Sequence, residues 1–141
     1  MKIDFFETEH GMDIRAAQGG VYQVELVRGS KSICLYIGES VWIASRCGKH
    51  LFSVLEEPEY FGLTKEDIDN DDLTLKFTVI TRIEGKKSEL GRGSYKEMEL
   101  LEIKKNNPLT QLQTSDRQIK NTQDKVKLVQ NKMKELKMKS E

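Results

Sequence analysis

Two β-prone runs joined by a short glycine-containing turn constrain the fold of this chain more than any other feature of its sequence. Residues 21–27 have the sequence VYQVELV and residues 32–37 the sequence SICLYI, with RGSK at residues 28–31 between them. Two runs of this kind, separated by a polar turn that contains glycine, favour a β-hairpin. Glycines at positions 19, 20 and 38 mark its outer ends.

The rest of the chain adds a strand and helices. Apolar residues at positions 73, 75, 77 and 79 alternate with threonine and lysine, which predicts a third strand over residues 73–82 with one buried face. Apolar spacing predicts an amphipathic helix near residues 41–56. A capping-box pattern at residues 94–97 and a proline at position 108 predict another helix near 95–107. The glycine-containing residues 84–93 before it are predicted to be a loop.

These elements predict an α+β fold. We expect a small three-stranded antiparallel sheet, formed by about 20–28, 32–38 and 73–82, flanked by the two helices and followed by a long C-terminal helix. The pattern does not assign residues 1–19 to any element.

The C-terminal segment differs from the rest of the chain in charge. Residues 1–107 hold 15 basic and 19 acidic groups, whereas residues 108–141 hold 8 and 4, in a chain of zero formal net charge. Apolar residues at 119, 126 and 133, and at 129 and 136, recur at the heptad spacing of a coiled coil. We predict a domain over residues 1–111 and a basic helical or coiled-coil tail over residues 112–141. Three roles remain open for the tail: joining a homodimer or partner protein, folding back on the domain, or lying along DNA.

Several classes of protein are not predicted. Cys34 and Cys47 belong to no CxxC pair or cysteine cluster, which argues against a zinc site and a disulfide framework. The N-terminus is acidic early and has no long apolar run, so we expect no signal peptide. No segment approaches the ~20 apolar residues of a membrane span. We therefore expect a cytoplasmic protein without membrane association.

Five residues suited to catalysis follow one another at defined intervals. The tripeptide GVY ends at Tyr22, and the tripeptide YIG begins at Tyr36. Arg46 lies ten residues after Tyr36, and His50 lies four residues after Arg46, so both share one face of the predicted helix. Glu99 follows much later, on the next long predicted helix.

This order resembles the GIY-YIG nuclease family, which includes homing endonucleases, excision-repair incision nucleases and some restriction enzymes. The sequence ELLEIKKNNP at residues 99–108 is similar to the family's E-x-x-x-I-K-K-x-x-P run, whose leading glutamate binds the metal. The resemblance covers roughly residues 20–111. It implies an Mg²⁺-dependent (or Mn²⁺-dependent) endonuclease that hydrolyses DNA phosphodiester bonds at a single-metal site.

The resemblance also implies a role for each of the five residues. Glu99 is the expected metal ligand, since Mg²⁺ prefers oxygen ligands and keeps several waters. Arg46 is expected to bind the phosphate, because its planar fork matches phosphate oxygens. Tyr22 is the expected general base or water-orienting group, assisted by His50, although an unperturbed tyrosine with a pKa of ~10 is a poor base. Tyr36 is expected to position the water or the phosphate.

Two positions depart from the family pattern. Gln111 stands where the family usually has asparagine, with the same amide on a longer stem. Glu39 stands where some repair-type members carry a lysine, which makes the site more similar to the homing and restriction branches. Gln111 and the basic residues of the predicted loop are the expected substrate-binding groups; the loop residues are Lys86, Lys87 and Arg92.

Each residue taken alone also has a structural explanation. Tyrosines in strands, such as Tyr22 and Tyr36, are usually packing residues, and an arginine such as Arg46 is usually a solvated surface group. Trp42 is expected in the core. The alternative function is therefore a catalytically inactive GIY-YIG-like module that binds nucleic acid or protein. A third possibility is an interaction protein whose heptads matter most.

Overall fold

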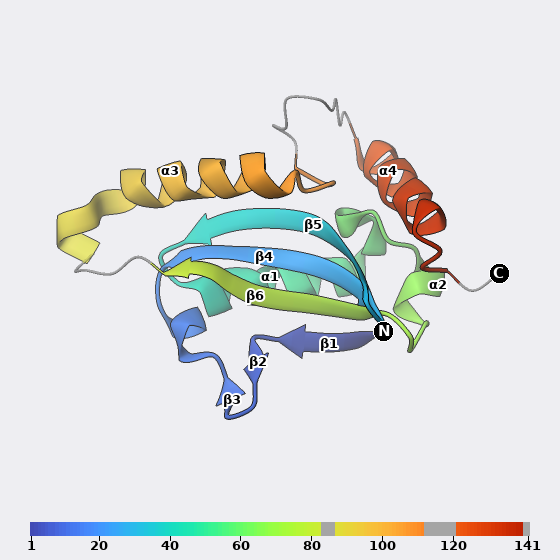
Figure 1. Ribbon diagram of the computed structural model, residues 1–141, viewed down its shortest axis with the longest axis horizontal. Coiled ribbons are helices and arrows are strands. Elements are labelled where there is room, and N and C mark those ends of the chain that lie inside the picture. The colour runs from blue at the N-terminus through green and yellow to red at the C-terminus, as the bar shows by residue number, and fades with distance from the viewer. Residues whose placement is uncertain (83–86, 112–120, 140–141) are drawn as a thin grey trace.

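The computed structural model describes residues 1–82, 87–111 and 121–139 (Figure 1). Its main sheet has the strand order β1-β6-β4-β5, formed by β1 (Lys2–Phe5), β6 (Thr74–Arg82), β4 (Gly20–Arg28) and β5 (Lys31–Ser40). A second sheet pairs the short strands β2 (Glu7–Thr8) and β3 (Gly11–Met12). The α+β class and the C-terminal helix are as predicted.

The sheet itself differs from the prediction. Strand β4 pairs antiparallel with both β5 and β6, as expected for the three predicted strands. Strand β1 adds a fourth, parallel to β6, with Ile3 opposite Leu75 and Phe5 opposite Phe77. The sheet is therefore four-stranded and mixed. Strand β1 is only four residues long, and so short a segment carries too little alternation to be recognised in the sequence.

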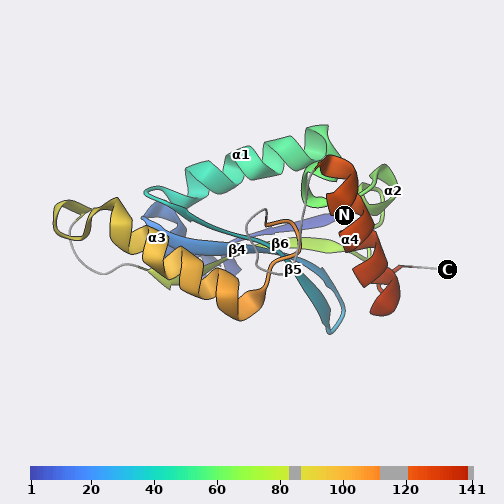
Figure 2. The same ribbon diagram turned by 90° about the horizontal axis from the view of Figure 1, so that it is seen from above.

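Helices cover both faces of the sheet. Helix α1 (Ile43–Glu56) lies on one face and helix α3 (Lys87–Asn106) on the other, as Figure 2 shows. Short elements connect them: η1 (Ile14–Ala17), η2 (Pro58–Phe61) and α2 (Lys65–Ile68). Helix α1 matches its predicted range closely. Helix α3 begins earlier than predicted, so the expected loop over residues 87–93 is helical; glycines weaken a helix by about 1 kcal/mol each without ending it.

A β-bulge in strand β5 determines which side chains face α1. Val24 pairs with Tyr36 but the next residue of β4, Glu25, pairs with Cys34, so Leu35 is an inserted residue. Side-chain direction alternates along a strand, and an inserted residue reverses the alternation beyond it. Tyr36 consequently packs with the α1-side core. Beyond the bulge, Ile37 faces the opposite side, where it packs with Val21 and Ile103 of α3.

The C-terminal helix α4 (Thr122–Glu135) is folded back on the domain. Val129 and Met133 are fully buried in the main core, and Leu136 packs against it. Gly62 of the loop after η2 adopts φ +71°, and a Cβ there would overlap Val129, so this turn requires glycine. Much of the heptad stripe therefore packs within the same chain; its first member, Ile119, lies outside the described residues.

A helix that crosses a membrane needs about 20 predominantly apolar residues. Within residues 1–82, 87–111 and 121–139, no helix combines the necessary length and apolar character.

Candidate active site

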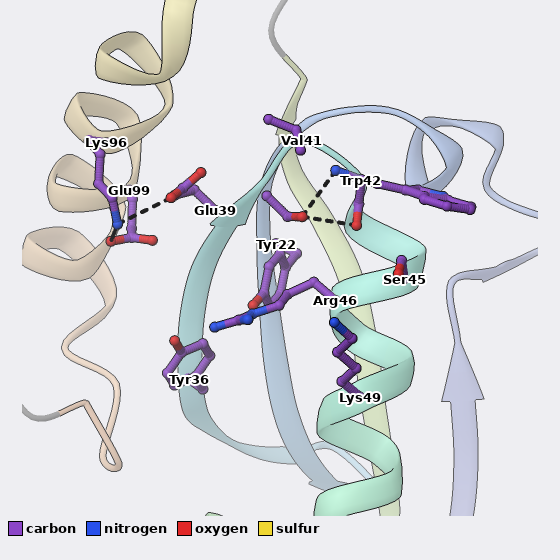
Figure 3. A pocket seen from close by; sticks show the side chains of 11 residues that line it. Tyr22, Tyr36, Glu39, Val41, Trp42, Ser45, Arg46, Lys49, Lys96 and Glu99 are labelled. Carbon is purple, nitrogen blue, oxygen red and sulfur yellow. Dashed lines mark hydrogen bonds and ion pairs between the residues drawn. The ribbon is translucent and has the colours of Figure 1, made fainter.

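Four of the five residues expected to act together line a pocket of about 410 Å³ at strand β5, the edge strand, between α1 and α3 (Figure 3); they are Tyr22, Tyr36, Arg46 and Glu99. We call one side the α1 wall, formed by Tyr22 and Arg46 together with His50, which is buried behind Tyr22. The other side is the α3 wall, formed by Glu39, Lys96 and Glu99. Strand β5 separates the two sides and contributes Tyr36. The remaining lining residues are Ser40, Val41, Trp42, Ser45 and Lys49.

A buried hydrogen bond joins the first tyrosine of the site to the histidine. The Tyr22 hydroxyl lies 2.7 Å from His50 Nε2, and the two side chains are 0% and 3% exposed. The other imidazole nitrogen, Nδ1, lies 2.8 Å from the hydroxyl of Tyr60 on η2. The imidazole thus has a hydroxyl partner at each of its two nitrogens.

Burial sets the protonation of these groups. Desolvation, followed by repulsion from Arg46, lowers the pKa of His50 to about 4, so the imidazole is neutral at pH 7. Desolvation raises the pKa of Tyr22 well above its usual value, although the nearby Arg46 opposes this shift. A neutral imidazole can accept the hydroxyl proton of Tyr22, whereas an imidazolium cannot.

Gly38 allows the two tyrosines to approach each other. It pairs with Tyr22 across β4 and β5, and a Cβ on Gly38 would overlap the hydroxyl and ring of Tyr22 and lie 2.8 Å from Tyr36 Cε1. Any side chain here would push the buried Tyr22 ring out of place. The glycine of the YIG tripeptide is therefore explained by packing over the tyrosine of the GVY tripeptide.

Arg46 projects from α1 toward both tyrosines (Figure 3). Its guanidinium is within hydrogen-bonding reach of the Tyr22 hydroxyl, and Tyr36 is also close enough to interact electrostatically. Arg46 is solvent-exposed, one helical turn before the buried His50. A single face of α1 thus presents a buried neutral base and an exposed cation.

The α3 wall carries charges of both signs. The Lys96 ammonium lies 3.1 Å from a Glu39 carboxylate oxygen and 3.7 Å from a Glu99 oxygen, and so bridges the two acids. The Glu39 side chain is only 2% exposed. The backbone N–H of Glu39 also donates to the Glu99 carboxylate. Partial burial raises the pKa of Glu99, with repulsion from Glu39 adding to the rise and Lys96 opposing it.

Tyr36, which lines the pocket, is held by Gln111. The Gln111 side-chain oxygen accepts a hydrogen bond of 3.1 Å from the Ile37 N–H, and its amide group interacts with the Tyr36 hydroxyl. Desolvation, followed by repulsion from Glu99, raises the pKa of Tyr36. Gln111 thus holds Tyr36 and strand β5. Tyr36 and Glu99 also line a second pocket of about 380 Å³, together with Tyr60, Gln111 and Lys125.

The acidic groups of the α3 wall have the right chemistry for a hard divalent cation. Carboxylate oxygens are its preferred ligands, and Glu99 and Glu39 meet at one pocket with a cationic group, Lys96, already between them. Within the described residues, no group of three or more histidine, cysteine or acidic side chains could hold a metal ion. A metal here would thus rely on few protein ligands and on water.

The other residues expected to bind substrate are Lys86, Lys87 and Arg92. Lys86 lies outside the described residues. Lys87 and Arg92 lie in the first part of α3, where the backbone alone is described, on a helix instead of the predicted loop.

The sequence pattern did not single out three residues at or next to the site. Tyr60 follows Pro58 on a short 3-10 turn, and Lys96 lies one turn before Glu99. Trp42, expected in the core, is 58% exposed at the pocket, so that prediction was wrong. Trp42 is at the N-cap of α1, where the Ser40 hydroxyl accepts from its N–H. A residue before the first helical turn lies outside the buried stripe of the helix, which explains why Trp42 is exposed. Of the three residues, only Lys96 could have been found from the sequence, because it lies one helical turn before the expected metal ligand Glu99.

Comparison of the chain with protein-family models, curated proteins and solved structures finds no match. The functional assignment therefore relies on the residues of the site and on their geometry.

Proposed function

We propose that this protein is a metal-dependent endonuclease of the GIY-YIG type that hydrolyses DNA phosphodiester bonds. The observation that carries the proposal is the 2.7 Å contact between Tyr22 and a neutral His50 beneath Arg46, facing Glu99 across one pocket. A proton acceptor, a phosphate-binding cation and a carboxylate are the groups that this hydrolysis requires.

The proton of the attacking water goes to the α1 wall in this proposal. Water gives a proton to the Tyr22 oxygen as the Tyr22 hydrogen moves to His50 Nε2. Tyr22 by itself is a poor base, because burial raises its pKa. The hydrogen-bonded imidazole removes this obstacle, since Tyr22 exchanges one proton for another without becoming a free phenolate. Because Tyr22 is fully buried, water reaches it only when Arg46 shifts from the hydroxyl toward a bound phosphate.

Arg46 and Tyr36 act on the phosphate. Arg46 is permanently charged and exposed, so it can donate to two phosphoryl oxygens and stabilise their charge in the transition state, an effect worth about 3–4 kcal/mol for a well-placed donor. Tyr36, whose hydroxyl interacts with Gln111, orients the phosphate or the attacking water.

Glu99 would hold a Mg²⁺ or Mn²⁺ ion, with Glu39 next to it, and the bound ion would supply charge stabilisation for the phosphate and the leaving oxygen. Within the chain, Lys96 neutralises these acids in the absence of the ion. The substrate, DNA, approaches as a polyanion, so the acidic wall is compatible with it only when cations balance its charge.

One observation favours the alternative of an inactive module that binds nucleic acid or protein. Lys96 forms ion pairs with both acids of the α3 wall and so occupies the place of a metal ion. A titration of DNA affinity against salt without divalent metal separates the two: strong binding that falls steeply with salt, combined with no cleavage under any metal condition, would support the inactive module.

The cleavage test uses supercoiled plasmid, purified protein, Mg²⁺ or Mn²⁺, and an EDTA control. We expect nicking or linearisation that EDTA abolishes and that Arg46→Ala reduces about 100-fold or more. Lys49→Ala is the matched loss of a positive charge and should retain most activity. Lys49 lies three residues after Arg46 on α1 and also lines the pocket. Equal activity in both variants would contradict the role of Arg46.

A further inference from the structure

A residue beyond those expected completes the buried part of the site. Tyr60 lies on η2, which begins at Pro58, and its hydroxyl is 2.8 Å from His50 Nδ1. Its ring packs edge-on against Phe61, with ring centroids 4.8 Å apart. Lys125 of α4 donates to the Tyr60 carbonyl oxygen at 3.3 Å and lies over the Tyr60 ring. Tyr60 is thus fixed from both sides, by its neighbour and by the C-terminal helix.

The hydrogen bonds of the three residues select one tautomer of His50. The Arg46 guanidinium, which can only donate, lies beside the Tyr22 hydroxyl (Figure 3), so the Tyr22 oxygen faces a donor and its hydrogen points elsewhere. That hydrogen is best used toward His50 Nε2, which must then be unprotonated, while Nδ1 carries the hydrogen and donates to Tyr60. With the opposite tautomer, Tyr22 would accept from both Arg46 and His50, and its own hydrogen would have no acceptor among the contacts found within the described residues.

We propose that Tyr60 is a positioning residue of this site, which holds His50 in the Nδ1–H tautomer and so makes Nε2 the acceptor of the Tyr22 proton. The inference rests on the proposed function for its catalytic meaning, but its structural content is independent of it. Tyr60 acts on the reaction through His50 and touches neither DNA nor the reacting atoms.

The arrangement also gives the proton a route out. When the Tyr22 hydrogen moves to His50 Nε2, the hydrogen on Nδ1 moves to the Tyr60 oxygen, and the original Tyr60 hydrogen passes to water. The imidazole ends neutral with its hydrogen on the other nitrogen, and the reverse shift resets it after turnover. Tyr60 lines the second pocket, of about 380 Å³, where water can take the proton.

Electrostatics favour this concerted shift over a charged intermediate. An imidazolium at His50 would lie near the Arg46 cation and among the rings of Tyr22, Tyr36, Tyr60 and Phe61. Burial and Arg46 already lower the pKa of His50 to about 4. A second hydroxyl at Nδ1 allows the ring to pass a proton on without holding two at once.

The tautomer can be measured without any cleavage assay. The chain has two histidines, so a His10→Gln variant assigns the ¹⁵N signals of the two imidazoles. In the full chain at pH 7, we expect His50 Nδ1 to give the signal of a protonated nitrogen and Nε2 that of an unprotonated one. In Tyr60→Phe, which keeps the ring but leaves the Nδ1–H without its acceptor, we expect the share of this pattern to fall in favour of Nε2–H or of averaged signals. Tyr36→Phe is the matched control: it removes the hydroxyl of a ring that packs 5.0 Å from the His50 ring (centroid to centroid) but makes no hydrogen bond to it among the described contacts, so it should keep the wild-type pattern.

Two results would overturn the inference: an Nε2–H tautomer in the wild-type chain, or an unchanged His50 spectrum in Tyr60→Phe. The wild-type spectrum decides even if the variant fails to fold. Where cleavage is observed, Tyr60→Phe should lower kcat about 10- to 100-fold, part of the contribution of a general base, with little change in KM. Absence of cleavage in the wild type would count against the proposed function alone, since the tautomer would still be tested.

Discussion

The two walls of the pocket differ in how they carry charge. On the α1 wall, Tyr22 and His50 are buried, neutral and hydrogen-bonded to each other, with Arg46 in solvent above them. On the α3 wall, Glu39 and Glu99 are drawn together around the ammonium of Lys96. The first wall is suited to moving a proton, because its neutral groups exchange hydrogens without separating charge. The second is suited to holding a cation, because two acids repel unless a positive group lies between them.

Burial favours the neutral form of the side chain on both sides of strand β5, with a different consequence on each side. Desolvation removes charge from His50 by lowering its pKa. It also raises the pKa of Glu99, so the Glu99 carboxylate is less stable alone than beside a cation. The bulge at Leu35 makes both possible, because it directs Tyr36 toward α1 while Ile37 faces α3.

The largest effect is expected from breaking the α1 wall. His50→Gln keeps a side chain that can hydrogen-bond to Tyr22 but cannot accept its proton at neutral pH. We predict a loss of about 100-fold or more in kcat, measured by single-turnover cleavage, with DNA affinity nearly unchanged. Cleavage within threefold of the wild type would show that the α1 wall does not move the proton.

The buried histidine should also make stability depend on pH. Its pKa is about 4 in the folded chain and 6.5 in the unfolded chain, so between these values the unfolded chain binds the proton preferentially. The free energy of unfolding should therefore fall as the pH drops from 7 to 4, by up to about 3 kcal/mol from His50. Urea titrations of the wild type and His50→Gln at several pH values would isolate this part, since carboxyl groups contribute equally to both. Parallel pH curves for the two chains would contradict a buried neutral imidazole.

A smaller effect is expected where β4 and β5 bring the two tyrosines together. Gly38→Ala places a methyl group against Tyr22 and Tyr36 and should lower the free energy of unfolding by about 1–3 kcal/mol. Gly48→Ala is the matched substitution: it lies in α1 with no atom within 4 Å of the added Cβ, and should stabilise by about 0.5–1 kcal/mol. Chemical denaturation measures both, and equal effects would argue against the close packing over Gly38.

The smallest effect concerns the α3 wall. Lys96→Met removes the positive group between the two acids and should tighten Mn²⁺ binding about fivefold, since a partly exposed pair contributes about 1 kcal/mol. Titration calorimetry with Mn²⁺ would measure this change, with Lys49→Met as the control at the same pocket. Weaker binding in Lys96→Met would contradict the view that Lys96 and the metal compete for one place.

Local pattern was sufficient for part of the fold and of the site. The hairpin, strand β6 and α1 could be predicted because the pattern of apolar residues within each segment is sufficient to identify it. The four-residue spacing of Arg46 and His50 likewise places both on one face of a helix. The position of Glu99 relative to them came from a family resemblance and not from periodicity. In the structure Tyr22, Tyr36, Arg46 and Glu99 line one pocket, and His50 is hydrogen-bonded to Tyr22 behind it.

The remaining features depend on long-range packing. Strand β1 pairs with β6, which is some seventy residues further along the chain. The two strands are parallel, so no hairpin turn between them marks the pairing in the sequence. Tyr60 reaches His50 because η2 reverses the chain after α1, and no interval in the sequence encodes that contact. The heptads of α4 have the spacing of a coiled coil, yet Val129 and Met133 pack into the chain's own core. An apolar stripe on a helix predicts that this face is buried, but it does not identify the segment or partner that buries it.

The most direct test of the two-wall account is cleavage of supercoiled plasmid by the wild type and by Glu99→Gln, each with Mg²⁺ and with EDTA. Glutamine keeps the shape of Glu99 and removes the charge that would hold the cation. The account predicts Mg²⁺-dependent nicking by the wild type and a loss of about 100-fold or more in the variant, with an unchanged fold by circular dichroism. Nicking by Glu99→Gln at the wild-type rate, or cleavage that persists in EDTA, would contradict it.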